Sequence, residues 1–176
     1  HRMDFVAFFL VILGALLGFL RYNLSDRSKI FMGDAGSLVL GFILVVSGLS
    51  LIESATDSNL LNVTISVVIG VLVLPVLDSL RVYRNRIKRG ESPFKADRTH
   101  FHHLVLALGL KHNLAAMLVM LVALLIVMIA VLVGGFFSVT VAIIALLLFF
   151  GGIASFLLLH QEVVIWGEKI KDLERN

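Results

Sequence analysis

Three histidines within four residues, near the middle of the chain, form its most chemically distinctive feature. They are His100, His102 and His103, and Arg98 and Lys95 precede them in the stretch SPFKADRTHFHH. Imidazole can donate to phosphate, stack on a base or bind metal, and Arg98 could hold a phosphate with two hydrogen bonds. If the stretch is extended, His100 and His102 point to the same side. We interpret it as a phosphate-binding segment, and the simpler alternative is an inert solvated loop.

Zinc is a weaker interpretation of the same histidines. A zinc ion takes three or four protein ligands, often including thiolates. The sequence has no cysteine, and Asp97 is the one nearby carboxylate. We therefore place zinc binding behind both phosphate binding and an inert loop.

Asp34 is the second candidate, and it lies in the stretch KIFMGDAGSLVLGF. Glycines on both sides would let a ligand approach the backbone closely, and a carboxylate there could hold Mg²⁺ together with substrate phosphate oxygens. The alternative is that Asp34 or Ser37 only caps the helix that follows. From the local sequence alone, the cap is the simpler interpretation.

The composition indicates what positions these residues. The 176-residue chain is 59% hydrophobic and 15% charged, with a mean hydropathy of +1.02, which predicts an integral membrane protein. We expect a single all-α, polytopic domain, because membrane spans of this length are helices. The excess positive charge is local, so nucleic acid is not an expected partner. The predicted spans cover residues 3–20, 38–52, 61–77, 114–136 and 139–159.

Particular residues predict how these spans end. Pro75 should kink or end the third span, and Gly134-Gly135 should form a tight turn between the last two. Residues 161–176 should form a helix. Basic residues predict the cytoplasmic side, so the loops 21–37 and 78–113 should both face the cytoplasm.

The loop 78–113 holds eight of the fifteen Lys and Arg residues and four of the six His. Its first part suits an interfacial helix that turns Arg81, Arg84 and Lys88 toward phosphate. For the arginines taken one by one, the topology signal alone is the preferred explanation. Gly90 should end this helix.

Two motifs occur together. FMGDAGS (Phe31–Ser37) and SPFKADRTHFHH (Ser92–His103), with LPVLDSLRV (Leu74–Val82) between them, resemble the polyprenyl-phosphate N-acetylhexosamine-1-phosphate transferases, or glycosyl transferase family 4. The His-Phe-His-His form is most similar to the undecaprenyl-phosphate N-acetylglucosamine branch. By this resemblance the chain is the C-terminal part of a larger bundle, similar to the last five of eleven spans.

The resemblance implies transfer of an N-acetylhexosamine 1-phosphate from a UDP-sugar to polyprenyl phosphate, with release of UMP. This step would initiate a lipid-linked cell-envelope glycan, such as lipopolysaccharide or teichoic acid, at the plasma membrane. It also implies Mg²⁺, or Mn²⁺, as cofactor, held by Asp34. Arg98, His100, His102, His103 and Lys95 would bind the nucleotide sugar, and Asp34, His102 and His103 would be catalytic.

The family's Asp-Asp and Asn-x-x-Asp-Gly-x-Asp-Gly motifs do not occur in the sequence. We therefore expect a fragment that is inactive alone and active within a longer protein. A membrane transporter and an inactive truncated remnant are the alternatives. The sequence leaves open the particular UDP-sugar, the pathway and whether the protein is a homodimer.

Overall fold

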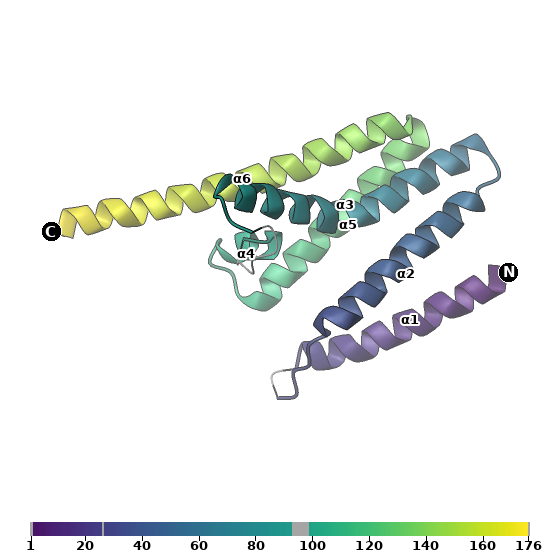
Figure 1. Cartoon of the computed structure of the whole chain (residues 1–176), viewed down its shortest axis with the longest axis horizontal. Coiled ribbons are helices and arrows are strands. Elements are labelled where there is room, and N and C mark those ends of the chain that lie inside the picture. Colours follow the sequence, from purple (N-terminus) through teal and green to yellow (C-terminus); the bar gives the residue numbers. More distant parts are fainter. Residues whose placement is uncertain (1, 26, 93–98, 176) are drawn as a thin grey trace. The chain divides into compact units, whose positions relative to one another are not determined.

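The computed structural model describes residues 2–25, 27–92 and 99–175, and every helix or strand element in these ranges is an α-helix (Figure 1). Five helices in the same ranges are long and apolar enough to cross a membrane. The prediction of an all-α, multi-pass membrane protein is therefore confirmed. The chain divides into two compact units between Ser50 and Leu51, and each unit is described by itself.

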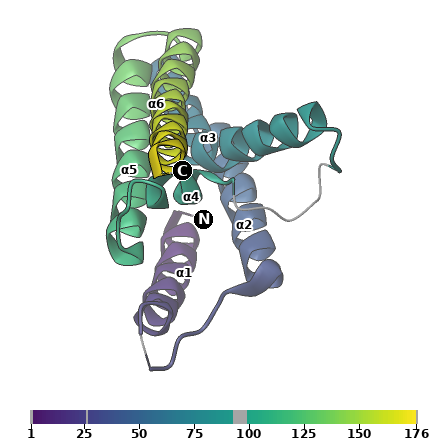
Figure 2. The same ribbon diagram turned by 90° about the vertical axis from the view of Figure 1, so that its left-hand side faces the viewer.

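The first unit contains α1 (Arg2–Asn23) and most of α2 (Gly33–Glu53) (Figure 2). In the connection between them, the side-chain amide of Asn23 donates to the carbonyl of Ile30 at 3.0 Å. Both helices expose most of their large apolar side chains, as helices that face lipid do. Seven apolar side chains from the two helices line a shallow hollow: Phe9, Ile12, Leu13, Leu16, Leu40, Ile43 and Leu44.

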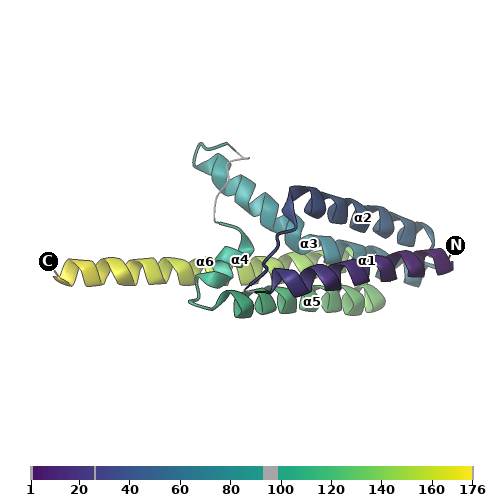
Figure 3. The same cartoon turned by 90° about the horizontal axis from the view of Figure 1, so that it is seen from below.

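The second unit is a bundle of long helices with a short helix packed against it (Figures 1 and 3). The long helices α3 (Ser58–Lys88), α5 (His112–Phe136) and α6 (Val139–Arg175) contact one another, and α4 (Phe101–Leu106) packs on α5 and α6. An apolar cluster from the three long helices is buried between them: Val73, Ile126, Ala130 and Leu146.

Small residues let α3 and α5 approach closely. A Cβ atom added at Gly134 would lie 2.5 Å from Ser66 Oγ, and one added at Gly70 would lie 2.7 Å from the Ala130 Cβ. Small residues at such positions allow close backbone packing between membrane helices. The predicted tight turn at Gly134-Gly135 is wrong, because α5 continues through both glycines to Phe136. Gly134 serves helix packing instead of chain reversal.

The helix α3 is longer than the predicted third span and has a well-defined start and end. The Asp57 carboxylate caps it by accepting from the Leu60 N–H at 2.7 Å, and the helix does not end at Pro75. Proline is tolerated in membrane helices whose neighbours support the freed backbone groups. Gly90 follows the C-cap with φ +71°, and the next amide bonds back to the Arg86 carbonyl at 3.0 Å. The prediction that Gly90 ends this helix is confirmed.

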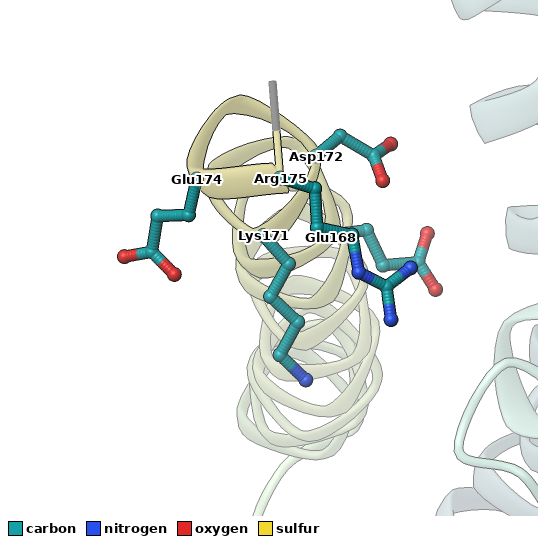
Figure 4. A pocket seen from close by; sticks show the side chains of 5 residues that line it. All are labelled: Glu168, Lys171, Asp172, Glu174 and Arg175. Carbon is teal, nitrogen blue, oxygen red and sulfur yellow. The ribbon is translucent and has the colours of Figure 1, made fainter.

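The helix α6 continues well past the predicted fifth span, so the prediction of a helical tail is confirmed as far as Arg175. Its last turns carry both signs of charge around a hollow lined by Glu168, Lys171, Asp172, Glu174 and Arg175. Figure 4 shows these side chains radiating from the helix in different directions. They do not converge on a common point, so this hollow is not a candidate site.

Candidate functional site

The histidine motif lies on and beside the short helix α4. Phe101, Leu104 and Val105 are buried, at the spacing that places residues on one face of a helix. They pack against Phe150 of α6, whose ring centroid lies 5.8 Å from that of Phe101, and against other buried residues of α5 and α6: Ala115, Ala154 and Leu157. From Phe101 onward the stretch is therefore helical and not extended, because burying this apolar face requires helical spacing.

The three histidines stand outside that buried face. His100 is the N-cap residue of α4, with φ −61° and ψ 158°, while His102 and His103 lie in its first turn. His102 is exposed and the other two are half-buried. The ring centroids of His102 and His103 are 4.0 Å apart. The helix thus brings these two imidazoles together and leaves them reachable by a ligand.

The His102 imidazole has an altered acidity. Partial burial lowers its pKa below the usual 6.5, and the neighbouring His103 and His100 lower it further, because two imidazolium charges repel at short range. His102 is therefore predominantly neutral at pH 7. Toward an anion it offers an N–H donor more readily than a full positive charge.

A buried carboxylate from α3 holds the start of α4. Both oxygens of Asp78 accept from the Phe101 N–H at 3.0 Å, and one lies 3.0 Å from His100 Nδ1. Arg81, one turn further along α3, donates to the Asp78 carboxylate at 2.7 Å and also to the carbonyl of Thr99. Because a carboxylate can only accept, Nδ1 of His100 carries the proton and Nε2 is left free on the other side of the ring.

Sequence reasoning did not assign a role to Asp78, and for Arg81 it favoured the topology signal over a contact with phosphate. The structure instead buries Arg81 against Asp78, with a side-chain exposure of 11%. An aspartate within the apolar run LPVLDSLRV, three residues before an arginine, was the available signal. The long-range partners of Asp78 and Arg81 lie 18 to 23 residues further along the chain, so they could not be identified from local spacing.

Asp34 belongs to the first unit and lies in the first turn of α2. Gly33 before it has φ +67°, a conformation that favours glycine. The Ser37 hydroxyl donates to the Asp34 carbonyl at 2.9 Å, so this hydroxyl does not cap the helix start. The Asp34 carboxylate is exposed and has no hydrogen-bond partner within the described part of the chain. It is therefore free to bind a cation.

The remaining predicted binding residues, Lys95 and Arg98, lie outside the described residues. Across the described ranges, no group of three or more His, Asp or Glu side chains is arranged to hold a metal ion. Asp34 alone still suits Mg²⁺, which commonly binds one or two carboxylates together with water and substrate phosphates. The donor set fits Mg²⁺ better than zinc.

Together, these features define a multi-pass membrane protein with a free carboxylate at the start of one span and a histidine helix tied to another. Residues 1–52 match the family model described as Glycosyl transferase family 4. The chain is 36% identical over 118 residues to a decaprenyl-phosphate N-acetylglucosaminephosphotransferase of Mycolicibacterium smegmatis, a match that covers 63% of the chain and 29% of that relative.

Relatives from other bacteria have similar names. The undecaprenyl-phosphate alpha-N-acetylglucosaminyl 1-phosphate transferase of Haemophilus influenzae is 29% identical, over 67% of the chain and 33% of the relative. That of Salmonella typhi is 31% identical, over 62% of the chain and 29% of the relative. No solved structure matches the chain significantly. The resemblance predicted from the two motifs is confirmed, and the chain spans about a third or less of the length of these relatives.

Proposed function

We propose that the full-length protein transfers N-acetylglucosamine 1-phosphate, or a related N-acetylhexosamine 1-phosphate, from a UDP-sugar to a polyprenyl phosphate. The observation that carries this proposal is the similarity, over about 63% of the chain, to transferases whose names specify that sugar phosphate and that class of lipid. The product would initiate a lipid-linked cell-envelope glycan. The 176 residues alone are expected to be inactive.

The reaction forms one bond to phosphorus and breaks another. An oxygen of the polyprenyl phosphate bonds to the phosphorus attached to the sugar, and the bond from that phosphorus to the UMP oxygen breaks. UMP leaves with the electron pair. Negative charge is spread over the transferring group during this step, so positioned donors and cations accelerate it.

The histidine helix would supply the donors for the nucleotide sugar. His102 and His103 project side by side from α4, where two N–H groups can meet neighbouring phosphate oxygens. His100 presents its free Nε2 beside them as an acceptor for an N–H or O–H of the nucleotide sugar, and Lys95 and Arg98 precede the same helix in the sequence. This cluster binds and orients the diphosphate, and His102 and His103 hold it during transfer.

Asp34 would hold Mg²⁺, or Mn²⁺ in its place. Once bound, the metal neutralises charge on the phosphate oxygens. The exposed carboxylate at the start of α2 is available for this purpose, and the backbone N–H groups of the first helical turn favour a nearby anion. The chain contributes the carboxylate, and a group that activates the lipid phosphate would come from elsewhere in the full-length protein.

The positions of the basic residues support a cytoplasmic site in the plasma membrane. The connection between α1 and α2 carries Arg27 and Lys29, and the end of α3 carries Arg86, Lys88 and Arg89. Basic residues next to membrane spans favour the cytoplasmic side. We place both the α2 start and α4 there, where a UDP-sugar is available.

The test is transfer from UDP-N-acetylglucosamine, ³²P-labelled on the sugar phosphate, to undecaprenyl phosphate by membranes that contain the full-length protein and Mg²⁺. We expect Asp34→Asn and His102→Ala to reduce lipid-linked product by about 10²-fold or more. Both variants should still insert in membranes. Glu53→Gln and His160→Gln are the matched controls and should retain activity. Undiminished transfer in both site variants would refute the assignment, and substrate uptake without UMP release would favour a transporter.

We further propose a second copy of the chain as a partner, joined along the end of α6. Apolar residues recur there at alternating four- and three-residue spacing: Leu159, Val163, Trp166, Ile170 and Leu173. All five are 52% to 77% exposed, and this spacing is that of a coiled-coil seam. Two copies inserted in the same orientation present parallel α6 helices. In that arrangement Lys169 of one copy faces Glu174 of the other, so the charges are complementary.

A further inference from the structure

We infer that Asp78 is a positioning residue for sugar-phosphate transfer: it fixes the tautomer and orientation of His100, a role that rests on the proposed function. Asp78 does not itself reach the exposed face of α4. Its carboxylate is buried beneath that face, and it acts through the imidazole and the backbone that it holds.

These contacts join one turn of α3 to three consecutive residues at the start of α4. Asp78 and Arg81 lie one helical turn apart on α3, and between them they bind the carbonyl of Thr99, the imidazole of His100 and the N–H of Phe101. Three successive residues of the histidine segment are thereby tied to a single turn of a membrane helix. This latch, Asp78 with Arg81, sets where α4 begins and in which direction His100 points.

Holding a helix with a buried carboxylate costs desolvation free energy. Burying it requires hydrogen-bond donors to replace water, and Asp78 receives them from Arg81, His100 and the Phe101 amide. Apolar packing already secures α4 through Leu104 and Val105. The carboxylate adds two things that packing cannot supply: an acceptor for the Phe101 N–H and a defined proton position on His100.

The proton position decides what His100 can offer to a ligand. With Nδ1–H directed at Asp78, Nε2 is a hydrogen-bond acceptor on the side away from α3. The His100 side chain is 39% exposed, against 13% for Asp78, so a ligand can reach it. Carboxylates behind functional histidines orient the ring and select the tautomer in this way.

Asp78→Asn is the informative substitution, because it keeps the size of the side chain and removes its charge. Its amide can donate to Nδ1, which would move the imidazole proton to Nε2. We expect ¹⁵N NMR of histidine-labelled full-length protein in nanodiscs, without substrate, to show His100 as the Nδ1–H tautomer before substitution and mainly Nε2–H afterwards. We expect transfer to fall about 10- to 100-fold.

A double-mutant cycle separates positioning from folding. His100→Ala removes the group on which Asp78 acts, so Asp78→Asn should cost little more activity in the His100→Ala background. Additive losses would indicate a structural role and would overturn the inference. Arg81→Lys is the second variant: it keeps the charge and removes two donors, Nε and Nη1, that are buried without acceptors within the described residues. It should leave the His100 tautomer unchanged.

The outcomes distinguish this inference from the proposed function. If the unaltered full-length protein transfers no sugar phosphate, the proposed function is wrong. If the unaltered protein is active but its His100 is the Nε2–H tautomer, the positioning role is overturned, and this result requires no variant to fold. If Asp78→Asn changes neither the tautomer nor the rate, the positioning role is also overturned.

Discussion

His102 illustrates how one residue can change its chemistry through its neighbours. Partial burial and the adjacent His103 and His100 lower its pKa below 6.5. The folded protein therefore favours neutral His102, whereas an unfolded chain would take up the proton near the usual value. Protonation of this residue should cost stability as the pH falls below 6.5.

The prediction is that His102 titrates below pH 6.5 in the unliganded protein. ¹H–¹³C NMR of histidine-labelled protein in nanodiscs measures the midpoint, with the His102 signal assigned by its loss in His102→Gln. His103→Asn should move that midpoint upward, because it removes a neighbouring positive charge. A midpoint at or above 6.5 in the unaltered protein would contradict the prediction.

At the same scale, residue types and spacing were enough to select the histidines and Asp34 as candidates. They were not enough to find Asp78 and Arg81, whose roles depend on burial and on partners more than fifteen residues away. The helical state of α4 was also missed. Its buried residues Phe101, Leu104 and Val105 do have helical spacing, but six residues are too few to establish a period.

At the level of the helices, the close contact between α3 and α5 leads to a prediction about stability. Gly134→Ala places a methyl group 2.6 Å from the Ser66 Cβ, so one helix must shift. Overpacking of this kind costs about 1–3 kcal/mol. The midpoint of thermal unfolding in detergent should fall for Gly134→Ala.

The neighbouring glycine provides the control for this contact. A Cβ at Gly135 meets only the Val63 Cγ2 at 3.8 Å, so Gly135→Ala should be neutral or slightly stabilising, as alanine favours the helix. Ser66→Gly should restore the stability of Gly134→Ala by making room. Equal effects of the two alanine substitutions would show that the close contact does not limit packing.

The long apolar helices were predictable because hydropathy and length depend only on local sequence. The points at which these helices end or turn were harder to predict. A pair of glycines serves equally well in a turn or in a close helix contact, and the choice at Gly134 depends on Ser66 in another helix. Pro75 is similarly ambiguous, since its effect on α3 depends on the helices around it.

For the whole molecule, the proposed pairing through α6 can be tested by cross-linking, since the sequence has no cysteine of its own. Leu173→Cys should form a disulfide-linked dimer on oxidation in membranes, visible on a non-reducing gel. Arg175→Cys is the control, because position 175 points away from the apolar seam. Cross-linking should therefore be much stronger at position 173.

Charge reversal tests the same arrangement. In the Leu173→Cys background, Lys169→Glu should reduce cross-linking, because it would face Glu174 of the second copy. Adding Glu174→Lys should restore it. Equal cross-linking at positions 173 and 175, or no effect of reversal, would place lipid or another part of the protein on the seam.

The unbroken course of α3 has a consequence for how this sequence can vary. Gly70 packs on α5, and Asp78 holds α4, on one helix without interruption. Each residue turns an α-helix by about 100°, so one extra or missing residue between them would aim the carboxylate away from its partners. The number of residues between Gly70 and Asp78 must therefore stay constant. Substitutions leave this number unchanged, whereas a single insertion or deletion does not.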